Sequence, residues 1–198
     1  MVSSSGAAHD EPLQLALRVI RVLEDLGATA WVGGSLASSI FGIPRATQDA
    51  DIVADLRVEM AVPLVERLGE DFYADTERIA SGIERRSSFN VIHLGTMFKV
   101  DVFLVGRDTW SERQIERRRS IEIDEDGTRI LVTSPEDIIL HKLTWYREGG
   151  HVSDRQWRDA LGVLQVQGDR IDRVYLGTMA DDLGVSHLLG ELLEEAGS

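Results

Sequence analysis

Residues 32–56, with the sequence VGGSLASSIFGIPRATQDADIVADL, constrain this chain more than any other segment. A hydrophobic residue leads into Gly-Gly-Ser, and a short run with helical character follows. Glycine lets a backbone approach a phosphate closely, and the start of a helix offers unpaired N–H groups and the positive end of its dipole. We therefore predict a phosphate-binding turn formed by Gly33, Gly34 and Ser35, with Ser35 as the N-cap of a helix that ends at residue 41.

Asp49 and Asp51 lie two residues apart at the start of the apolar run that follows. In a strand, such residues share one face and lie about 6.5–7 Å apart. Both carboxylates then face one divalent cation, and Mg²⁺ prefers carboxylate, water and phosphate oxygens. An Asp-x-Asp pair by itself is more often a solvated strand edge, whereas the preceding Gly-Gly-Ser turn favours a metal site. The combined pattern is typical of phosphoryl-transfer sites.

Asp101 is a third carboxylate, within the apolar run FKVDVFLV at residues 98–105. Its face of the predicted strand carries Lys99 and Phe103, and the opposite face is entirely apolar. A carboxylate in so apolar a strand is costly to bury unless it is paired or metal-bound. Two interpretations remain open: a surface Asp101 paired with Lys99, or a third metal-binding carboxylate that helps to deprotonate an acceptor hydroxyl.

The periodicity of apolar residues alternates between helix and strand, which predicts an α/β fold with a mixed sheet packed on helices. We expect a disordered tail at residues 1–10, a core at 11–133 and a helical C-terminal part at 134–198 that packs on the core. Ser134 and Pro135, followed by two acids, are a helix start signal. Helices are expected at 12–26, 35–41, 59–68, 107–118 and 134–147, with two or three more between 154 and 195; strands are expected at 29–32, 51–56, 89–94, 97–105, 121–123 and 129–132, with hairpin turns at Gly95-Thr96 and Asp126-Gly127.

Composition narrows the classes of function. The chain of 198 residues has no cysteine, which excludes disulfides, thiolate metal sites and a cysteine nucleophile. The first residues do not form a signal peptide and no apolar run approaches the length of a membrane span, so we expect a cytoplasmic protein without a membrane partner. The formal net charge of −13 repels a polyanion at long range and suits a small cationic acceptor or a protein more easily than a nucleic acid.

The three motifs, in this order, resemble those of the DNA polymerase β-type nucleotidyltransferase superfamily. Residues 45–52, RATQDADI, resemble the Arg-x-Thr-x-Asp-x-Asp run of its tRNA-end-adding branch and of the AbiEii-like toxins. His141-Lys142 in one predicted helix and Arg158-Asp159 in the next resemble the Lys and Lys/Arg-Asp motifs of the AbiEii/MenT toxin nucleotidyltransferases. Arg158 stands where those toxins often carry Lys.

The resemblance implies a nucleotidyltransferase-type fold and a Mg²⁺-dependent enzyme that moves a nucleoside monophosphate from a nucleoside triphosphate to a hydroxyl. Its implied catalytic residues and ligands of one or two Mg²⁺ ions are Asp49, Asp51 and Asp101, and its implied nucleotide-binding residues are Gly33, Gly34, Ser35, Lys142, Arg158 and Asp159. The acceptor stays open between tRNA, a protein and a small molecule, as does a toxin role with an antitoxin protein as partner. The alternatives are an antibiotic-modifying nucleotidyltransferase and a non-catalytic relative that binds a nucleotide or a partner.

Each C-terminal candidate also has a plain structural explanation. Lys142 is an ordinary surface lysine if its apolar stem lies along the helix. Asp159 and Arg155 are spaced as an exposed i,i+4 ion pair. Trp145, Tyr146 and Trp157 are suited to stacking on a base, although aromatic residues on helices more often pack in a core. The sequence leaves these alternatives open.

Overall fold

The computed structural model describes residues 7–124 and 127–197, with side chains from residue 12 onward. Its strands are β1 (Thr29–Val32), β2 (Asp49–Asp55), β3 (Phe72–Tyr73), β4 (Ser88–His93), β5 (Phe98–Leu104), β6 (Arg119–Glu122) and β7 (Arg129–Val132). Within the described residues these strands form one mixed sheet in the order β3-β4-β5-β2-β1-β7-β6. β2 pairs with β5 in parallel, as β1 does with β7, and the other neighbours are antiparallel. The predicted mixed sheet is confirmed.

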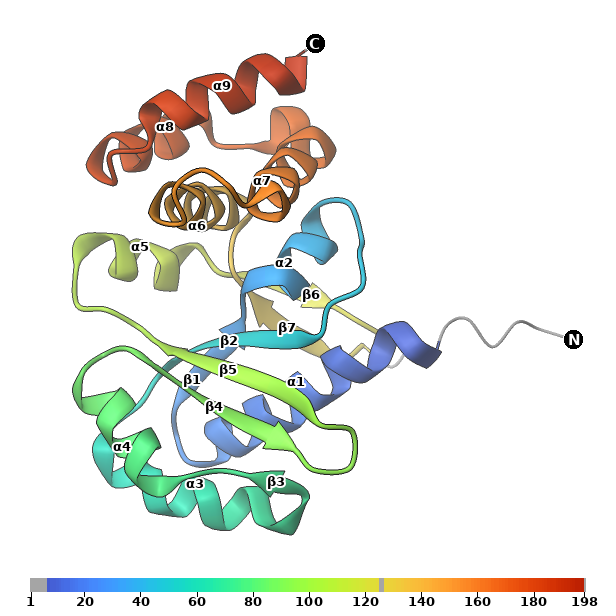
Figure 1. The fold of residues 1–198 in the computed structure, drawn as a ribbon, viewed down its shortest axis with the longest axis vertical. Coiled ribbons are helices and arrows are strands. Elements are labelled where there is room, and N and C mark those ends of the chain that lie inside the picture. The colour runs from blue at the N-terminus through green and yellow to red at the C-terminus, as the bar shows by residue number, and fades with distance from the viewer. Residues whose placement is uncertain (1–6, 125–126, 198) are drawn as a thin grey trace, which may run out of the picture.

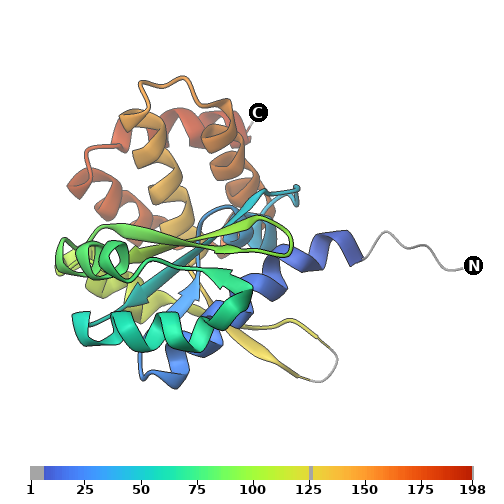
Figure 2. The same ribbon diagram turned by 60° about the horizontal axis from the view of Figure 1, so that its bottom comes forward.

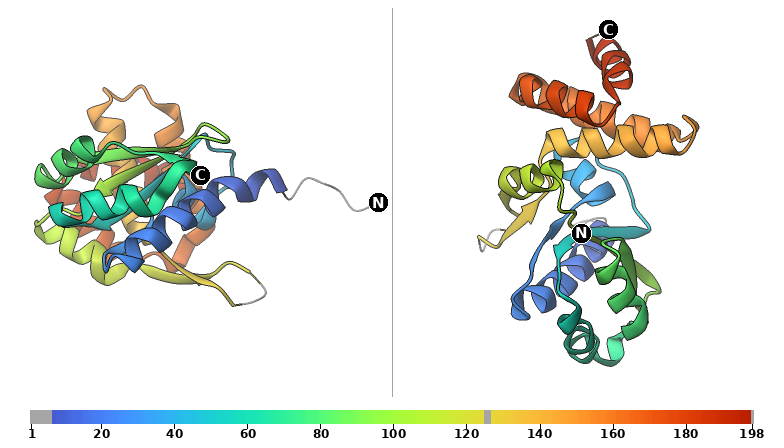
Figure 3. Two further views of the ribbon diagram at one scale, coloured as in Figure 1. Left: turned by 90° about the horizontal axis from the view of Figure 1, so that it is seen from below. Right: turned by 90° about the vertical axis from the view of Figure 1, so that its left-hand side faces the viewer.

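The helices form layers on both sides of this sheet. They are α1 (Ala7–Asp25), α2 (Gly34–Phe41), α3 (Ala61–Leu68), α4 (Thr76–Glu84), α5 (Thr109–Arg117), α6 (Pro135–Glu148), α7 (Asp154–Gln167), α8 (Arg173–Asp182) and α9 (Ser186–Gly197). Figure 1 shows α6–α9 stacked at one end of the molecule and α3 and α4 at the other, with the sheet between them. α1 packs on β1, β2 and β5 from the side of α3 and α4 (Figures 2 and 3). The α/β fold with a helical C-terminal part is therefore as expected.

The two faces of β2 and β5 differ in what they bury. Ile52 and Val102, with the other apolar residues of that face, are fully buried in the main core. Asp49, Asp51 and Asp101 lie on the opposite face and are half-buried. Because successive side chains of a strand point to opposite faces, this alternation confirms the predicted face of Asp101. The polar face of the sheet is the one that lies toward the C-terminal helices.

The predicted start of α6 is also confirmed. Ser134 is the N-cap, its hydroxyl accepts a hydrogen bond from the Asp137 amide, and proline occupies the first turn. The fully buried Asp137 carboxylate accepts hydrogen bonds from the Ser134 hydroxyl at 2.5 Å, from Trp110 Nε1 at 3.1 Å and from the Tyr175 hydroxyl at 2.7 Å. These bonds join α5, α6 and α8 at one buried carboxylate.

Some boundaries differ from the predicted ones. α1 begins at Ala7 and continues through Pro12, which removes a backbone hydrogen bond without ending the helix, so residues 7–10 are helical rather than part of a disordered tail. Residues 1–6 of that predicted tail lie outside the described residues. The N-cap of α2 is Gly33 rather than Ser35, because the backbone is already extended at Gly33 and the helix begins at the next residue.

Residues 72–84 hold two elements that were not predicted from the sequence, β3 and α4. The side chain of Asp75 caps α4 by accepting from the Arg78 amide at 3.0 Å, so a start signal was present in the sequence. The predicted turn at Asp126-Gly127 lies partly outside the described residues, and Gly127 has a φ of 80°. In the part of the chain that the structure describes, no helix is both long and apolar enough to cross a membrane.

Substitution of Asp137 tests the buried connection between the helices. Asp137→Ala leaves Trp110 Nε1 and the Tyr175 hydroxyl without their acceptor, and we expect the free energy of unfolding to fall by about 2–4 kcal/mol. Tyr175→Phe removes one of these bonds and should cost about 1 kcal/mol. Urea denaturation measures both variants, and a loss below about 0.5 kcal/mol for Asp137→Ala would contradict the importance of this connection.

Candidate functional site

Asp51 and Asp101 are register partners across the parallel strands β2 and β5. Asp49 precedes Asp51 by two residues on the same face, and its own partner on β5 is Lys99. On the other side of β5, Asn90 of β4 is the register partner of Asp101. The structure therefore brings the three predicted carboxylates together on the polar face of the sheet. We call Asp49, Asp51 and Asp101 the carboxylate group.

The Gly-Gly-Ser turn lies directly against this carboxylate group. The Gly33 amide donates to the backbone oxygen of Asp51 at 2.9 Å, and the Ser35 amide donates to Asp51 Oδ2 at 3.2 Å. Gly34 has a φ of 50°, and a Cβ built there would lie 1.6 Å from Asp51 Oδ2. Position 34 therefore requires glycine both for its backbone conformation and for space. The start of α2 and the end of the turn present backbone amides to the site.

The other two carboxylates also have protein partners. Thr47 Oγ1 donates to the backbone oxygen of Asp49 at 2.9 Å and to Asp49 Oδ1 at 3.1 Å. Lys99 Nζ lies 2.6 Å from Asp101 Oδ2, and this hydrogen bond raises the pKa of Lys99. The predicted Lys99–Asp101 pair thus exists, and the same Asp101 occupies the third position of the carboxylate group.

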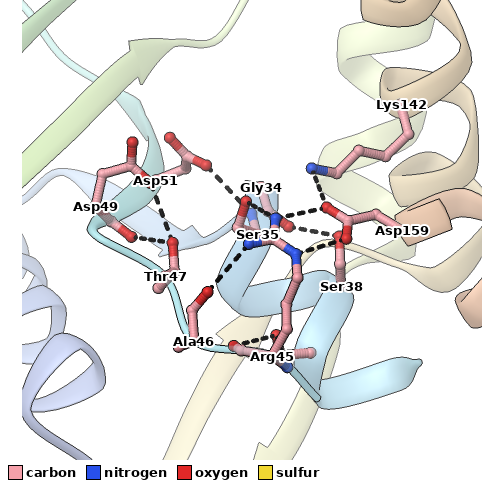
Figure 4. A network of polar contacts seen from close by, with 11 residues as sticks. Gly34, Ser35, Ser38, Arg45, Ala46, Thr47, Asp49, Asp51, Lys142 and Asp159 are labelled. Atoms are coloured by element: carbon pink, nitrogen blue, oxygen red, sulfur yellow. Dashed lines mark hydrogen bonds and ion pairs between the residues drawn. The ribbon is translucent and has the colours of Figure 1, made fainter. Parts of the chain in front are cut away.

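Two cations meet at Asp159, next to the start of α2 (Figure 4). Arg45 binds Asp159 through two parallel hydrogen bonds, from Nε to Oδ1 at 2.7 Å and from Nη2 to Oδ2 at 2.8 Å. Arg45 Nη2 also donates to the Ser35 hydroxyl at 2.8 Å. Lys142 Nζ lies 2.9 Å from Asp159 Oδ2. We call Ser35, Arg45, Lys142 and Asp159 the cation cluster.

Burial makes the electrostatics of the cation cluster strong. The side chains of Lys142 and Asp159 are only 2% and 6% exposed, which excludes a surface role for Lys142. Burial lowers the pKa of Lys142, although the charge of Asp159 opposes this shift. Burial alone would raise the pKa of Asp159, but the hydrogen bond from Arg45 and the charge of Lys142 outweigh it and lower that pKa. Asp159 is therefore ionised at neutral pH and holds both cations in place.

The pKa of Asp51 shifts in the opposite direction from that of Asp159. Burial raises the pKa of its carboxyl, and the hydrogen bond from the Ser35 amide offsets this effect only in part. The neighbouring Asp49 and Asp101 add like charges that raise the same pKa further. The carboxylate group thus concentrates negative charge that a bound cation would stabilise.

The donor set fits Mg²⁺. Among the described residues, no group of three or more His, Asp or Glu side chains is arranged to hold a metal ion by itself. Mg²⁺ usually takes only one or two carboxylates from the protein and completes its shell with water and substrate phosphates. Asp51 and Asp101 are neighbours in register, with Asp49 beside them, and all of their ligand atoms are oxygens. The carboxylate group therefore suits a cation that is shared with a phosphate substrate.

A cavity of about 390 Å³ adjoins this site. Gly33, Gly34 and Asp51 line one edge of it. Its other walls come from β1, β2, β4, β5, α5 and α6 and from the loops before β4 and α5, and they include Trp31, Phe103, Trp110 and Trp145. The Gly-Gly-Ser turn, the carboxylate group and an aromatic cavity thus form one continuous surface.

Arg158 is the predicted site residue that the structure does not bring to this surface. Its side chain is 80% exposed and lies 4.0 Å from Asp154, one turn away on α7. Arg45 instead supplies the arginine that binds Asp159, and it was not among the predicted site residues. Both Arg45 and Thr47 belong to the motif RATQDADI, so the signal was present next to the aspartates.

Comparisons with solved structures identify the same fold. The antibiotic-resistance factor ANT(2″)-Ia, in complex with adenylyl-2″-tobramycin, matches with a TM-score of 0.57 and 14% identity over 86% of this chain and 97% of that chain. The lincosamide antibiotic adenylyltransferase LnuA, bound to lincomycin, matches with a TM-score of 0.52 and 12% identity over 77% and 96%. A nucleotidyltransferase-like antigenic protein from Paracoccidioides brasiliensis matches with a TM-score of 0.51 and 15% identity over 89% and 92%.

Sequence comparison adds no closer relative. No protein-family model matches the chain. No curated protein matches it either. At identities of 12–15%, the structural matches establish a shared architecture. The chain has the nucleotidyltransferase fold.

Proposed function

We propose that the protein is a Mg²⁺-dependent nucleotidyltransferase that transfers a nucleoside monophosphate from a nucleoside triphosphate to a hydroxyl and releases pyrophosphate. The observation that supports this most strongly is the register pairing of Asp51 with Asp101, directly beside a turn that admits only glycine at position 34. A glycine turn at a helix start suits phosphate, and paired carboxylates suit the cation that accompanies it. The nucleotidyltransferase fold is consistent with this activity.

The triphosphate would lie against the start of α2, within reach of the cation cluster. Ser35 offers its hydroxyl and amide, and Gly34 lets the backbone approach closely. Arg45 presents a planar guanidinium that suits phosphate oxygens, and Lys142 adds a second positive charge. Asp159 holds both cations at this place. In the proposed complex, phosphate oxygens replace some of the contacts that Asp159 now makes.

Positioning and charge stabilisation account for most of the catalysis in phosphoryl transfer. Asp49, Asp51 and Asp101 would hold one or two Mg²⁺ ions, which when bound offset charge on the transferred phosphate and on the leaving pyrophosphate. Asp101 lies on β5, on the side of the carboxylate group away from the glycine turn. We assign it the acceptance of the proton from the acceptor hydroxyl.

We further propose that the chain belongs to the AbiEii/MenT-like toxin group of this superfamily. Lys142 and Asp159 come from the two C-terminal motifs of that resemblance, and their contact in the cation cluster supports the assignment. The exposed Arg158 adds no support. The acceptor of such an enzyme would be tRNA or a protein hydroxyl, and its partner in the cell would be an antitoxin protein.

Antibiotic modification is the second candidate, because solved structures of this fold include proteins bound to adenylyl-2″-tobramycin and to lincomycin. One acceptor screen separates the two candidates. The protein is incubated with Mg²⁺ and each α-labelled nucleoside triphosphate, with tRNA, cell protein, tobramycin or lincomycin as acceptor. Label in tRNA or protein supports the toxin-like assignment, and label in an antibiotic supports the second. Absence of both label transfer and pyrophosphate release in every combination would contradict the proposed activity.

The variant Asp51→Asn should separate chemistry from stability. Loss of the charge should lower nucleotidyl transfer roughly 100-fold or more. Because burial raises the pKa of Asp51, its ionised form costs folding free energy at neutral pH, and asparagine removes that cost. We therefore expect Tm in Mg²⁺-free buffer to equal or exceed that of the wild type. Asp25→Asn, at an exposed aspartate at the end of α1, is the control and should keep turnover. Wild-type turnover in Asp51→Asn would show that Asp51 has no part in catalysis.

The variant Asp159→Asn should destabilise the fold, because it leaves Lys142 and Arg45 without their common partner. Breaking a buried ion pair on one side costs about 3–5 kcal/mol. The pKa of Asp159 is lowered in the folded state, so its contribution is complete above the unfolded pKa of about 3.9. It is lost as the pH falls through the lower folded value. Urea denaturation at several pH values from about 2.5 to about 7 measures the difference in the free energy of unfolding between the variant and the wild type.

The matched control for this experiment is Asp154→Asn on the same helix. Asp154 contacts the exposed Arg158 at 4.0 Å, and such surface pairs contribute less than about 0.5 kcal/mol. If Asp159→Asn were no more destabilising than Asp154→Asn at pH 7, the cation cluster would not be the structural connection described above.

A further inference from the structure

The aromatic cavity has a floor made by one row of the sheet. Trp31, Val53, Phe103 and Ser88 are successive register partners across β1, β2, β5 and β4, and all four line the cavity. On β2 and β5 this row lies two residues beyond the row that carries Asp51 and Asp101. Residues two apart on a strand are about 6.5–7 Å apart, so the floor begins directly beside the carboxylate group.

The roof of the cavity is made by two helices. Trp110 and Gln114 come from α5, and His141 and Trp145 come from α6. The ring centroid of Trp145 lies 5.9 Å from that of Phe103 on the floor and 5.8 Å from that of His141, which in turn lies 4.4 Å from that of Trp110. The rings of floor and roof thus form one connected aromatic wall.

Most of the polar groups in this wall already have partners. His141 Nε2 lies 2.8 Å from Gln114 Oε1, and Trp31 Nε1 donates to Thr133 at 3.1 Å. Burial lowers the pKa of His141 to about 4, so the imidazole is neutral at physiological pH. Among the described residues of the lining, the charged side chains away from Asp51 are Asp108 and Arg86, and Arg86 donates to Asp55 at 2.7 Å and to the backbone oxygen of Val105 at 3.2 Å. The rest of the surface is mainly apolar and aromatic.

The cavity is continuous with the cation cluster. Gly33 and Gly34 belong both to the phosphate turn and to the edge of the cavity. Lys142 Nζ lies 5.6 Å from the ring centroid of Trp145, which is one turn further along α6. A molecule that is held by its phosphates at the turn therefore reaches the aromatic wall with the group attached to those phosphates.

We propose that this cavity binds the nucleobase of the nucleoside triphosphate, which stacks on Trp145. The inference rests on the proposed function and identifies where the other half of that substrate lies. Stacking on an aromatic ring tolerates every base because each has a π face, and it is worth about 1–3 kcal/mol per base. Since purines have the larger ring system, ATP and GTP should bind more tightly than CTP and UTP.

The lining favours a nucleobase over a cationic acceptor. A polycationic acceptor requires several carboxylates, and among the described residues that line the cavity these are Asp51 and Asp108. Both oxygens of Asp108 already accept from Ser111, at 3.0 and 2.8 Å. Asp51 faces the proposed cation. The walls that remain are suited to a flat, weakly polar ring.

The test compares ATP with inorganic tripolyphosphate, which carries the phosphates without a base. Calorimetric titration in Mg²⁺ gives both dissociation constants for wild type, Trp145→Ala, Trp145→Phe and Trp157→Ala. Trp157 is the matched control: it lies on α7, donates to Glu195 at 2.8 Å and packs on Tyr146 outside the cavity lining. We expect Trp145→Ala to weaken ATP by roughly tenfold or more and to leave tripolyphosphate unchanged. Trp145→Phe should recover most of the loss, and Trp157→Ala should match wild type.

The outcomes separate this inference from the proposed function. If Trp145→Ala and Trp145→Phe bound ATP as tightly as wild type while tripolyphosphate bound normally, the cavity would not hold the base and would be assigned to the acceptor. If Trp145→Ala lost tripolyphosphate as well, its effect would be structural, and Trp145→Leu, which keeps an apolar side chain but has no π face, would decide. Weakened ATP with normal tripolyphosphate in Trp145→Leu would retain the base assignment, and wild-type ATP affinity would overturn it. If the wild type bound neither ligand, both proposals would fail.

Discussion

The contact of Asp159 with Arg45 and Lys142 is the interaction on which the rest of the structure depends. It joins α7, α6 and the segment between α2 and β2 at one buried carboxylate. Removal of one member of such a group leaves an uncompensated charge, which costs more than the intact group contributes to stability. The same three side chains also place two positive charges beside the Gly-Gly-Ser turn. Structural and proposed functional roles therefore coincide here, and the C-terminal helices are part of the site.

The second constraint is the register of β2 and β5. Because side chains alternate between faces, a slip of one residue would move Asp51 or Asp101 into the apolar core. The fully buried Ile52 and Val102 on the opposite face fix that register. The hydrophobic core thus sets the geometry of the carboxylate group, and the adjacent row of the sheet forms the floor of the aromatic cavity. One alternation pattern determines the core, the carboxylates and the cavity.

Local sequence signals predicted several features whose cause is local, although the Asp75 cap of α4 was missed. The turn at Gly34, the cap at Ser134 and the face of Asp101 follow from a few neighbouring residues. The partner of Asp159 does not, because Arg45 is 114 residues away and only the folded chain brings them together. Arg158 is adjacent to Asp159, yet successive helix residues point about 100° apart, so one is buried and the other exposed. The burial of Lys142 likewise depends on how α7 covers α6.

Mg²⁺-dependent binding of nucleoside triphosphates is the most direct test of the proposed role of the carboxylate group. Calorimetric titrations of all four triphosphates, with Mg²⁺ and with chelator, would use wild type and the double variant Asp49→Ala/Asp51→Ala. We predict binding that requires Mg²⁺ and that is lost in the double variant while the protein stays folded. Binding of equal affinity without Mg²⁺, or in the double variant, would contradict the assignment of the carboxylate group.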